Sequence, residues 1–130
     1  MPFAETADGL QFYFEVHGDG PPLLLISGTG HDHKFWAGQL PLLSTRYRCI
    51  IFDNRGMGQS SSPAPGYSLA DMADDAAAVL DAAEIDIAHV MGFSMGGHIA
   101  QELALRHPSR VRSLGLHHTW ARADDRLTSF

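Results

Sequence analysis

The segment at residues 92–96, Gly-Phe-Ser-Met-Gly, constrains the fold of this chain more than any other. The short apolar run at 87–91 precedes it and is typical of a buried parallel strand. After it, apolar residues recur at helical spacing until His107-Pro108 ends the pattern. The sequence therefore predicts a strand that turns sharply into a helix, with Ser94 at the turn.

Ser94 is the candidate catalytic residue at this turn. So sharp a turn forces the serine into a sparsely allowed backbone conformation and leaves its hydroxyl exposed. A Cβ at Gly92 or Gly96 would collide with the neighbouring chain, which explains the two glycines. The backbone N–H of Met95 begins the following helix, where unpaired donors and the helix dipole stabilise a developing oxyanion. The alternative is a serine in an ordinary strand-to-helix turn.

Strand patterns come before this segment as well. Residues 10–17 alternate apolar and polar side chains, as a strand with one buried face does, and residues 7–9 supply a hairpin turn before them. The apolar runs at 23–26 and 48–52 predict buried strands. Strands that alternate with helices imply right-handed crossovers and, after the opening hairpin, a parallel sheet.

Two further segments predict helices. Residues 35–43 place apolar side chains on one side of a helix, which Pro41 kinks or divides. Ser68 begins a second helix as its N-cap, with Asp71 as the acidic member of a capping box. The residues expected on the buried face of that second helix are Leu69, Met72, Ala73, Ala76, Val79, Leu80 and Ala83.

Three motifs, taken in chain order, resemble the amino-terminal half of an α/β-hydrolase. They are Ser-Gly-Thr-Gly at 27–30, Phe-Asp-Asn-Arg-Gly-Met-Gly-Gln-Ser at 52–60 and Gly-Phe-Ser-Met-Gly-Gly at 92–97. Their wording is similar to that of small bacterial esterases, enol-lactonases and haloperoxidase-like hydrolases. The resemblance covers nearly the whole chain and implies a three-layer α/β core, mostly parallel after an opening antiparallel hairpin.

The resemblance also implies roles for three residues. Ser94 would be the nucleophile, and the amides of Thr29 and Met95 would form the oxyanion hole. Thr29 and Ser94 each follow the end of a predicted parallel strand, so they are expected to meet at one edge of the sheet. Family members commonly have His at the position of Ser27, so the support of the loop differs here. No metal, cofactor or particular substrate-binding residue is implied.

The other triad members of this family lie later in the chain. The order is Ser, then Asp or Glu, then His, with the last two beyond the strand that follows the nucleophile helix. Val111 to His118 are that predicted strand, and the sequence ends at Phe130. We therefore expect residues 1–130 to be a single domain, truncated after this strand, that lacks the cap and the carboxyl-terminal part. The isolated chain is expected to be inactive.

Other polar residues are weaker candidates. His31 and His33 follow the first motif and are expected near the substrate pocket, although two histidines on a loop are a weak metal signal. Asp53 is expected to cap its own turn and not to act in catalysis.

A makeshift triad is a further alternative. His117 and His118 end the last predicted strand on opposite faces, so one of them would reach the active edge, with Asp124 or Asp125 as the acid.

Composition narrows the classes of function. The net charge of −6 argues against nucleic acid or an anionic membrane surface as a partner. No apolar run reaches the length of a membrane span, and residues 1–5 lack the pattern of a signal peptide. Cys49, the single cysteine, falls in an apolar strand pattern and is expected to be a buried thiol. A cytoplasmic enzyme is the expected class.

The expected function is hydrolysis of an ester, lactone or similar acyl bond in a small molecule, through an acyl-enzyme at Ser94. A perhydrolase or C–C hydrolase with the same serine, and a non-catalytic binding module, are the alternatives. The strand Val111 to His118 would expose an unpaired edge. We expect the remainder of the parent chain or a second copy to cover that edge.

Overall fold

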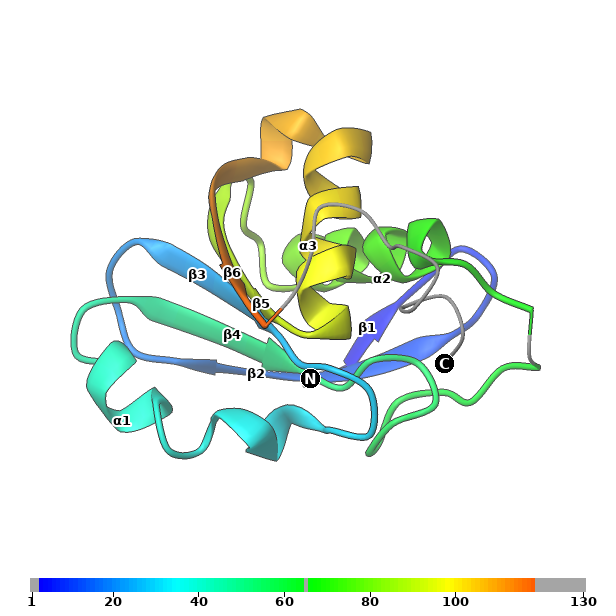
Figure 1. The fold of residues 1–130 in the computed structure, drawn as a ribbon, viewed down its shortest axis with the longest axis horizontal. Helices are drawn as coiled ribbons and strands as arrows, with labels where there is room; N and C mark the ends of the chain where they lie inside the picture. The colour runs from blue at the N-terminus through cyan, green and yellow to red at the C-terminus, as the bar shows by residue number, and fades with distance from the viewer. Residues whose placement is uncertain (1–2, 65, 119–130) are drawn as a thin grey trace.

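A six-stranded sheet forms the centre of the computed structural model, which describes residues 3–64 and 66–118 (Figure 1). Its strand order is β1-β2-β4-β3-β5-β6. β2 pairs antiparallel with both β1 and β4, and the remaining neighbours pair in parallel, which confirms the predicted hairpin and parallel sheet. The strands are β1 (Phe3–Glu5), β2 (Gln11–His17), β3 (Pro22–Ile26), β4 (Arg48–Phe52), β5 (Ala88–Phe93) and β6 (Val111–His117).

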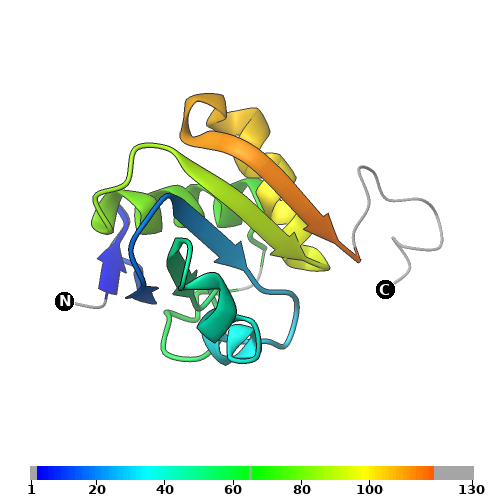
Figure 2. The same ribbon diagram turned by 90° about the vertical axis from the view of Figure 1, so that its left-hand side faces the viewer.

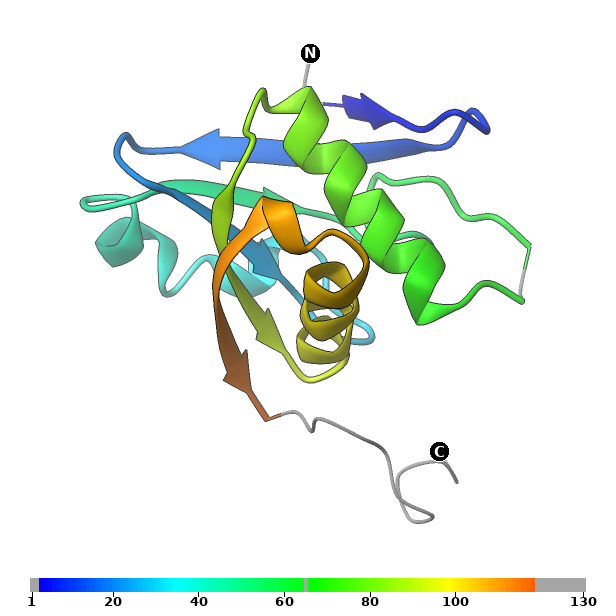
Figure 3. The same ribbon diagram turned by 90° about the horizontal axis from the view of Figure 1, so that it is seen from above.

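Helices cover both faces of the sheet, so the architecture has three layers. α2 and α3 pack on one face, and η1 and α1 on the other (Figures 1 and 3). This arrangement confirms the α/β class predicted from the sequence. The helices are η1 (His33–Trp36), α1 (Leu40–Leu43), α2 (Leu69–Ala82), α3 (Met95–Arg106) and η2 (Pro108–Arg110), of which η1 and η2 are 3₁₀.

The central strands are apolar throughout because they line two cores. Successive side chains of a strand point to opposite faces. Leu24 and Ile50 pack with α2 and α3, whereas Leu25 and Cys49 pack with Trp36 on the other face. Cys49 is fully buried, as expected.

α2 begins as the sequence predicts. The Asp71 amide donates to the Ser68 hydroxyl at 3.1 Å, and the Ser68 amide donates to the Asp71 carboxylate at 2.8 Å, which completes the capping box. Six of the seven apolar residues expected on the buried face of α2 are buried. The seventh, Leu69, is 39% exposed, because the first turn of α2 extends past the sheet (Figure 3).

Some predicted bounds were wrong. The predicted division of the helix at 35–43 is confirmed, but the break between the two short helices lies at 37–39, before Pro41. Pro41 sits in the first turn of α1, where a missing N–H breaks no intrahelical bond.

Strand ends also differ from the prediction. β5 begins after Ile87 and β6 ends before His118, and Val16, near the end of β2, is 38% exposed. Residues at the ends of these strands continue the apolar or alternating pattern, but no neighbouring residues among those described bury them.

β6 forms one edge of the sheet (Figure 2). Within the described part of the chain, β6 pairs with β5 alone. Leu114 and Leu116 on this strand are about two-fifths exposed, at 40% and 41%. Among residues 3–64 and 66–118, no helix is both long and apolar enough to cross a lipid bilayer.

Candidate functional site

Ser94 joins β5 to α3 in a strained conformation. Its φ of 56° and ψ of −120° lie outside the usual regions, as the sharp turn requires. A Cβ at Gly92 would lie 2.3 Å from the Gly96 carbonyl oxygen, and one at Gly96 would lie 2.1 Å from the Ile26 carbonyl oxygen. The two glycines therefore let β3, β5 and α3 approach closely enough to form this turn, as predicted.

The turn at residues 27–33, after β3, packs against Ser94. A Cβ at Gly28 would lie 3.1 Å from the Ser94 Cβ and 3.6 Å from the Met95 amide nitrogen. The Thr29 hydroxyl lies 3.2 Å from the Met95 sulfur. The structure thus brings together Thr29, Ser94 and Met95, which are far apart in sequence.

Two amides near Ser94 have no acceptor among residues 3–64 and 66–118. The Met95 amide belongs to the first turn of α3, where no intrahelical acceptor exists. The Thr29 amide donates no hydrogen bond to any residue that the structure describes. Free amide donors next to a nucleophilic hydroxyl can stabilise the oxyanion that forms when the hydroxyl attacks a carbonyl.

Ser27 supports the 27–33 turn without the histidine that family members commonly have there. Its hydroxyl donates to the His31 carbonyl oxygen at 3.2 Å, and its own carbonyl oxygen accepts from the Asn54 side-chain amide at 3.0 Å. The His31 amide in turn donates to the Gly28 carbonyl oxygen at 3.2 Å. Ser27 and Asn54 are almost fully buried, so the bond between them is shielded from water.

Asp53 is a structural hub at the end of β4. Its carboxylate accepts from the Gln59 amide at 2.9 Å, so it does cap its own turn as predicted. The same carboxylate accepts from the His33 amide at 2.6 Å and from the His33 Nδ1 at 2.8 Å. His33 is therefore buried against Asp53 and does not line an open pocket. No local sequence pattern links these two residues, which are 20 positions apart.

A metal ligand set is suggested by the same residues. Ligand atoms of Asp32, His33 and Asp53 lie within 4.8 Å of one another. Each is already engaged, because the Asp32 carboxylate caps η1 through the Lys34 amide at 2.9 Å, and Asp53 holds His33. The arrangement is that of a hydrogen-bonded turn.

His117, the last residue of β6, and His118, which follows it, line one hollow instead of facing opposite sides. His117 and His118 border an apolar cavity of about 490 Å³ together with Phe93 and Trp36. His118 has a positive φ of 51°, so the alternation of the strand stops there. The His117 carbonyl oxygen accepts from the Ser94 amide at 2.9 Å.

The Ser94 side chain makes no capping hydrogen bond, and no general base contacts its hydroxyl within the described ranges. The acids proposed to orient such a base, Asp124 and Asp125, lie outside the described residues.

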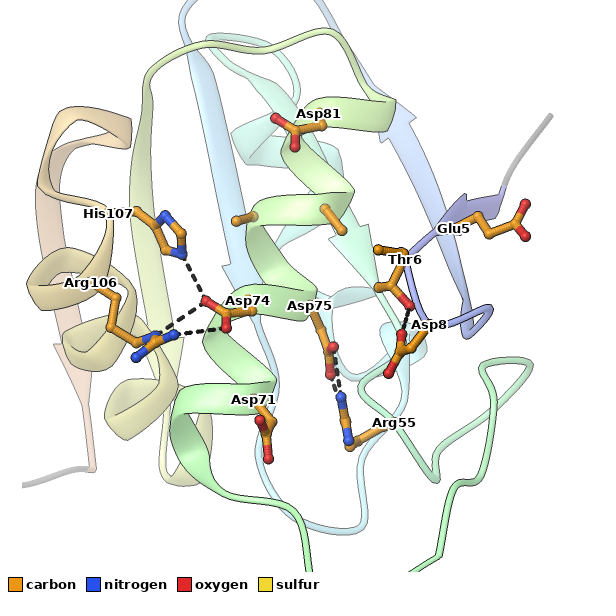
Figure 4. Close-up of a pocket in the computed structure, with 13 residues that line it drawn as sticks. Glu5, Thr6, Asp8, Arg55, Asp71, Asp74, Asp75, Asp81, Arg106 and His107 are labelled. Carbon is orange, nitrogen blue, oxygen red and sulfur yellow. Dashed lines mark hydrogen bonds and ion pairs between the residues drawn. The ribbon is translucent and has the colours of Figure 1, made fainter.

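A second hollow, of about 610 Å³, lies at the other end of α3 from Ser94 and is lined by charged residues of α2 (Figure 4). Arg55 and Asp75 form a buried ion pair at 2.7 Å, and burial raises the pKa of Asp75. Asp74 contacts Arg106 at 2.9 Å and His107 at 2.8 Å (Figure 4). The hydrogen bond from Arg106 lowers the pKa of Asp74. These groups pair with one another and link α2 to its neighbours.

Comparison with known proteins decides the family. The family model of the alpha/beta hydrolase fold matches residues 21–127. The chain belongs to the α/β hydrolase family. It is 45% identical over 124 residues to a protein of Azorhizobium caulinodans named "Putative carbamate hydrolase RutD".

Solved structures of this family superpose closely. A hydrolase from Pseudomonas aeruginosa PA01 is 37% identical, with a TM-score of 0.90 over 95% of the chain. The enol-lactonase from Burkholderia xenovorans LB400 is 30% identical, with a TM-score of 0.88 over 93% of the chain. The match covers 95% of this chain and 46% of the Azorhizobium protein, and 47% and 48% of the two solved chains. The chain thus spans about half the length of these relatives.

Proposed function

We propose that this chain supplies the nucleophile and the oxyanion hole of a serine hydrolase. Ser94 attacks the carbonyl carbon of an ester, lactone or similar acyl bond. A general base passes the serine proton to the leaving oxygen, and the bond between that oxygen and the carbonyl carbon breaks as the acyl-enzyme forms. The amides of Thr29 and Met95 donate to the oxygen that becomes negatively charged in the transition state. Water, activated by a general base, then releases the acid and restores the serine.

One observation carries the proposal: the strained Ser94 lies beside a turn with free amide donors. A strained conformation costs about 1–3 kcal/mol and persists where the surrounding structure imposes it. Here the close approaches at Gly92 and Gly96 impose it. A serine with no role at this position would not need a backbone of this kind.

The substrate class follows from the same chemistry. Esters, lactones and carbamates all present a carbonyl with a leaving oxygen or nitrogen, and each passes through a tetrahedral oxyanion. The relatives carry names from these classes, a carbamate hydrolase and an enol-lactonase among them. We propose an uncharged acyl bond in a small molecule as the substrate. A cytoplasmic location is part of the same proposal and fits the acidic chain with a single buried cysteine.

The test uses a protein extended to the length of the relatives. Ser94→Ala should abolish turnover of activated esters, lactones and carbamates. Ser113→Ala is the matched control, because it removes the same chemical group, a hydroxyl, on β6, where Ser113 contacts His89 at 2.6 Å and lies away from the Ser94 turn. Activity that survives Ser94→Ala would refute the proposal. Perhydrolysis or C–C cleavage in place of acyl hydrolysis would favour a perhydrolase or a C–C hydrolase with the same serine. No turnover of any substrate would favour a non-catalytic binding module.

We also propose that the β6 edge is an interface. Its unpaired backbone groups and its exposed leucines would pair with a further strand of the hydrolase fold, supplied by the sequence that the relatives have beyond this half. A second copy of the chain is the other occupant that such an edge accepts.

A further inference from the structure

Two consecutive residues that follow β4, Asp53 and Asn54, hold the two ends of the 27–33 turn. At its start, the Asn54 side chain donates to the Ser27 carbonyl oxygen at 3.0 Å. At its end, the Asp53 carboxylate accepts from the His33 amide at 2.6 Å. Thr29 lies between these two anchors. Its side chain is exposed and contacts the Met95 sulfur, so the anchors at the two ends of the turn help to set its conformation.

The end anchor contains more than a backbone contact. The His33 ring lies between two carboxylates, with Nδ1 at 2.8 Å from Asp53 and Nε2 at 3.4 Å from Glu15. A carboxylate only accepts hydrogen bonds, so Nδ1 carries a proton. The Tyr13 ring lies 5.0 Å from the His33 ring and helps to enclose it. The His33 side chain thus connects the turn to β2 as well as to the end of β4.

Glu15 is itself fixed in place. It accepts from the Tyr13 hydroxyl at 2.5 Å and contacts His17 at 2.8 Å. The Tyr13 hydrogen bond lowers the pKa of Glu15, which keeps this carboxylate charged beside the His33 ring. Two carboxyl groups, one fully buried and one partly buried, therefore hold the imidazole from opposite sides.

We propose that His33 is a positioning residue for the oxyanion donor at Thr29. The ring fixes the end of the 27–33 turn, so that the Thr29 amide stays beside the Met95 amide without moving during reaction. Preorganised donors of this kind are worth more than donors that must be ordered at the moment of reaction. This inference rests on the proposed function, but its first test needs no turnover.

The test measures backbone order in the 130-residue chain by ¹⁵N relaxation. In the unsubstituted chain, the amides of Thr29 and Gly30 should have order parameters near those of the sheet, about 0.85. His33→Ala should lower them to below about 0.6, while the amides of α2 stay rigid. His31→Ala is the matched control, since His31 lies in the same turn with an exposed side chain, and should change nothing. His33→Gln should restore the order of the Thr29 and Gly30 amides, because the side-chain amide of glutamine can donate to Asp53.

Three outcomes would overturn the inference. Unchanged order at Thr29 in His33→Ala would do so, as would an equal loss of order in α2, because His33 would then be an ordinary core residue. If His33→Ala does not fold, Glu15→Gln is measured in its place. Rigid Thr29 and Gly30 amides in Glu15→Gln would also contradict the proposed role of His33.

A kinetic measurement follows in a protein that turns over substrate. There His33→Ala should lower kcat by about 10- to 100-fold at an unchanged KM, because a donor displaced by about 1 Å costs this much. A higher KM at an unchanged kcat would contradict a role in positioning the donor. Because backbone order does not depend on Ser94, a failure of the hydrolase proposal and a failure of this one are distinguishable.

Discussion

Ser94 shows how a single residue stores strain that its neighbours maintain. Its positive φ is compatible with the fold only because the adjoining glycines lack side chains. The Ser94 amide also donates to the His117 carbonyl oxygen, which links the turn to β6. The geometry of the Ser94 turn is therefore a property of β3, β5, β6 and α3 together.

The first prediction tests this close packing. Gly96→Ala places a methyl group 2.1 Å from the Ile26 carbonyl oxygen, and backbone on both sides has little room to shift. The substitution should lower the free energy of unfolding by about 1–3 kcal/mol or more. Gly38→Ala is the control, because nothing lies within 4 Å of its Cβ position. Urea titrations followed by circular dichroism would measure both, and equal stability for the two variants would contradict the packing argument.

Elements are joined by charge as well as by apolar contact. α2 and the end of α3 meet where Asp74 binds Arg106 and His107. All three side chains are at least one-third exposed, so solvent screens the pair and its contribution is modest. The buried pair of Arg55 and Asp75, in contrast, leaves a lone buried charge if one partner is removed.

The second prediction concerns pH. The pKa of Asp74 is lowered in the folded chain, chiefly by Arg106, so its stabilising effect is present above pH 4 or so and is lost as the pH falls through the folded pKa. Asp74→Asn should be less stable than the parent near pH 7 and should converge with it in acid. Asp19→Asn, in the exposed turn after β2, should show no such difference. Parallel acid denaturation curves for Asp74→Asn and the parent would contradict the assignment.

The third prediction concerns β6. Its free edge and its exposed leucines should make the 130-residue chain associate at high micromolar concentration. Leu114→Lys should shift the chain toward monomer, because a charge on an edge strand opposes pairing. Leu105→Lys on α3 is the control, since Leu105 is 78% exposed but belongs to no strand. Sedimentation that shows a well-behaved monomer of the parent chain would contradict the interface proposal.

At the scale of the whole molecule, the described residues hold the proposed nucleophile and its two proposed donors but no base in contact with the serine. Serine hydrolases that lose triad members keep a residual acceleration of only about 10³ to 10⁴ over water. The fourth prediction is that the 130-residue chain is nearly inert toward activated esters, and that a chain of the relatives' length is faster by several orders of magnitude. Burst kinetics from residues 1–130 alone would show that His117 or His118 serves as the base after all.

Much of the fold was predictable because its signals are local. The apolar runs and the capping box at Ser68 placed the strands and α2 within a residue or two. Residues 35–43 were harder, because their apolar spacing fits one helix while the structure divides them at 37–39. Packing of Trp36 against β3 and β4 favours two short helices over one.

The sequence by itself determined the strand-to-helix turn at Ser94, since only glycine permits the close approaches on either side. It also determined that the carboxyl ends of the parallel strands share one edge of the sheet, and this placement brings Thr29 near that serine. Only the tertiary structure decided the role of His33, because its partners lie elsewhere in the chain, Asp53 just after β4 and Glu15 on β2, and no periodicity relates them. Contacts between distant residues depend on how the layers pack. The residue pattern of one strand or helix does not specify which residues of another element will pack against it.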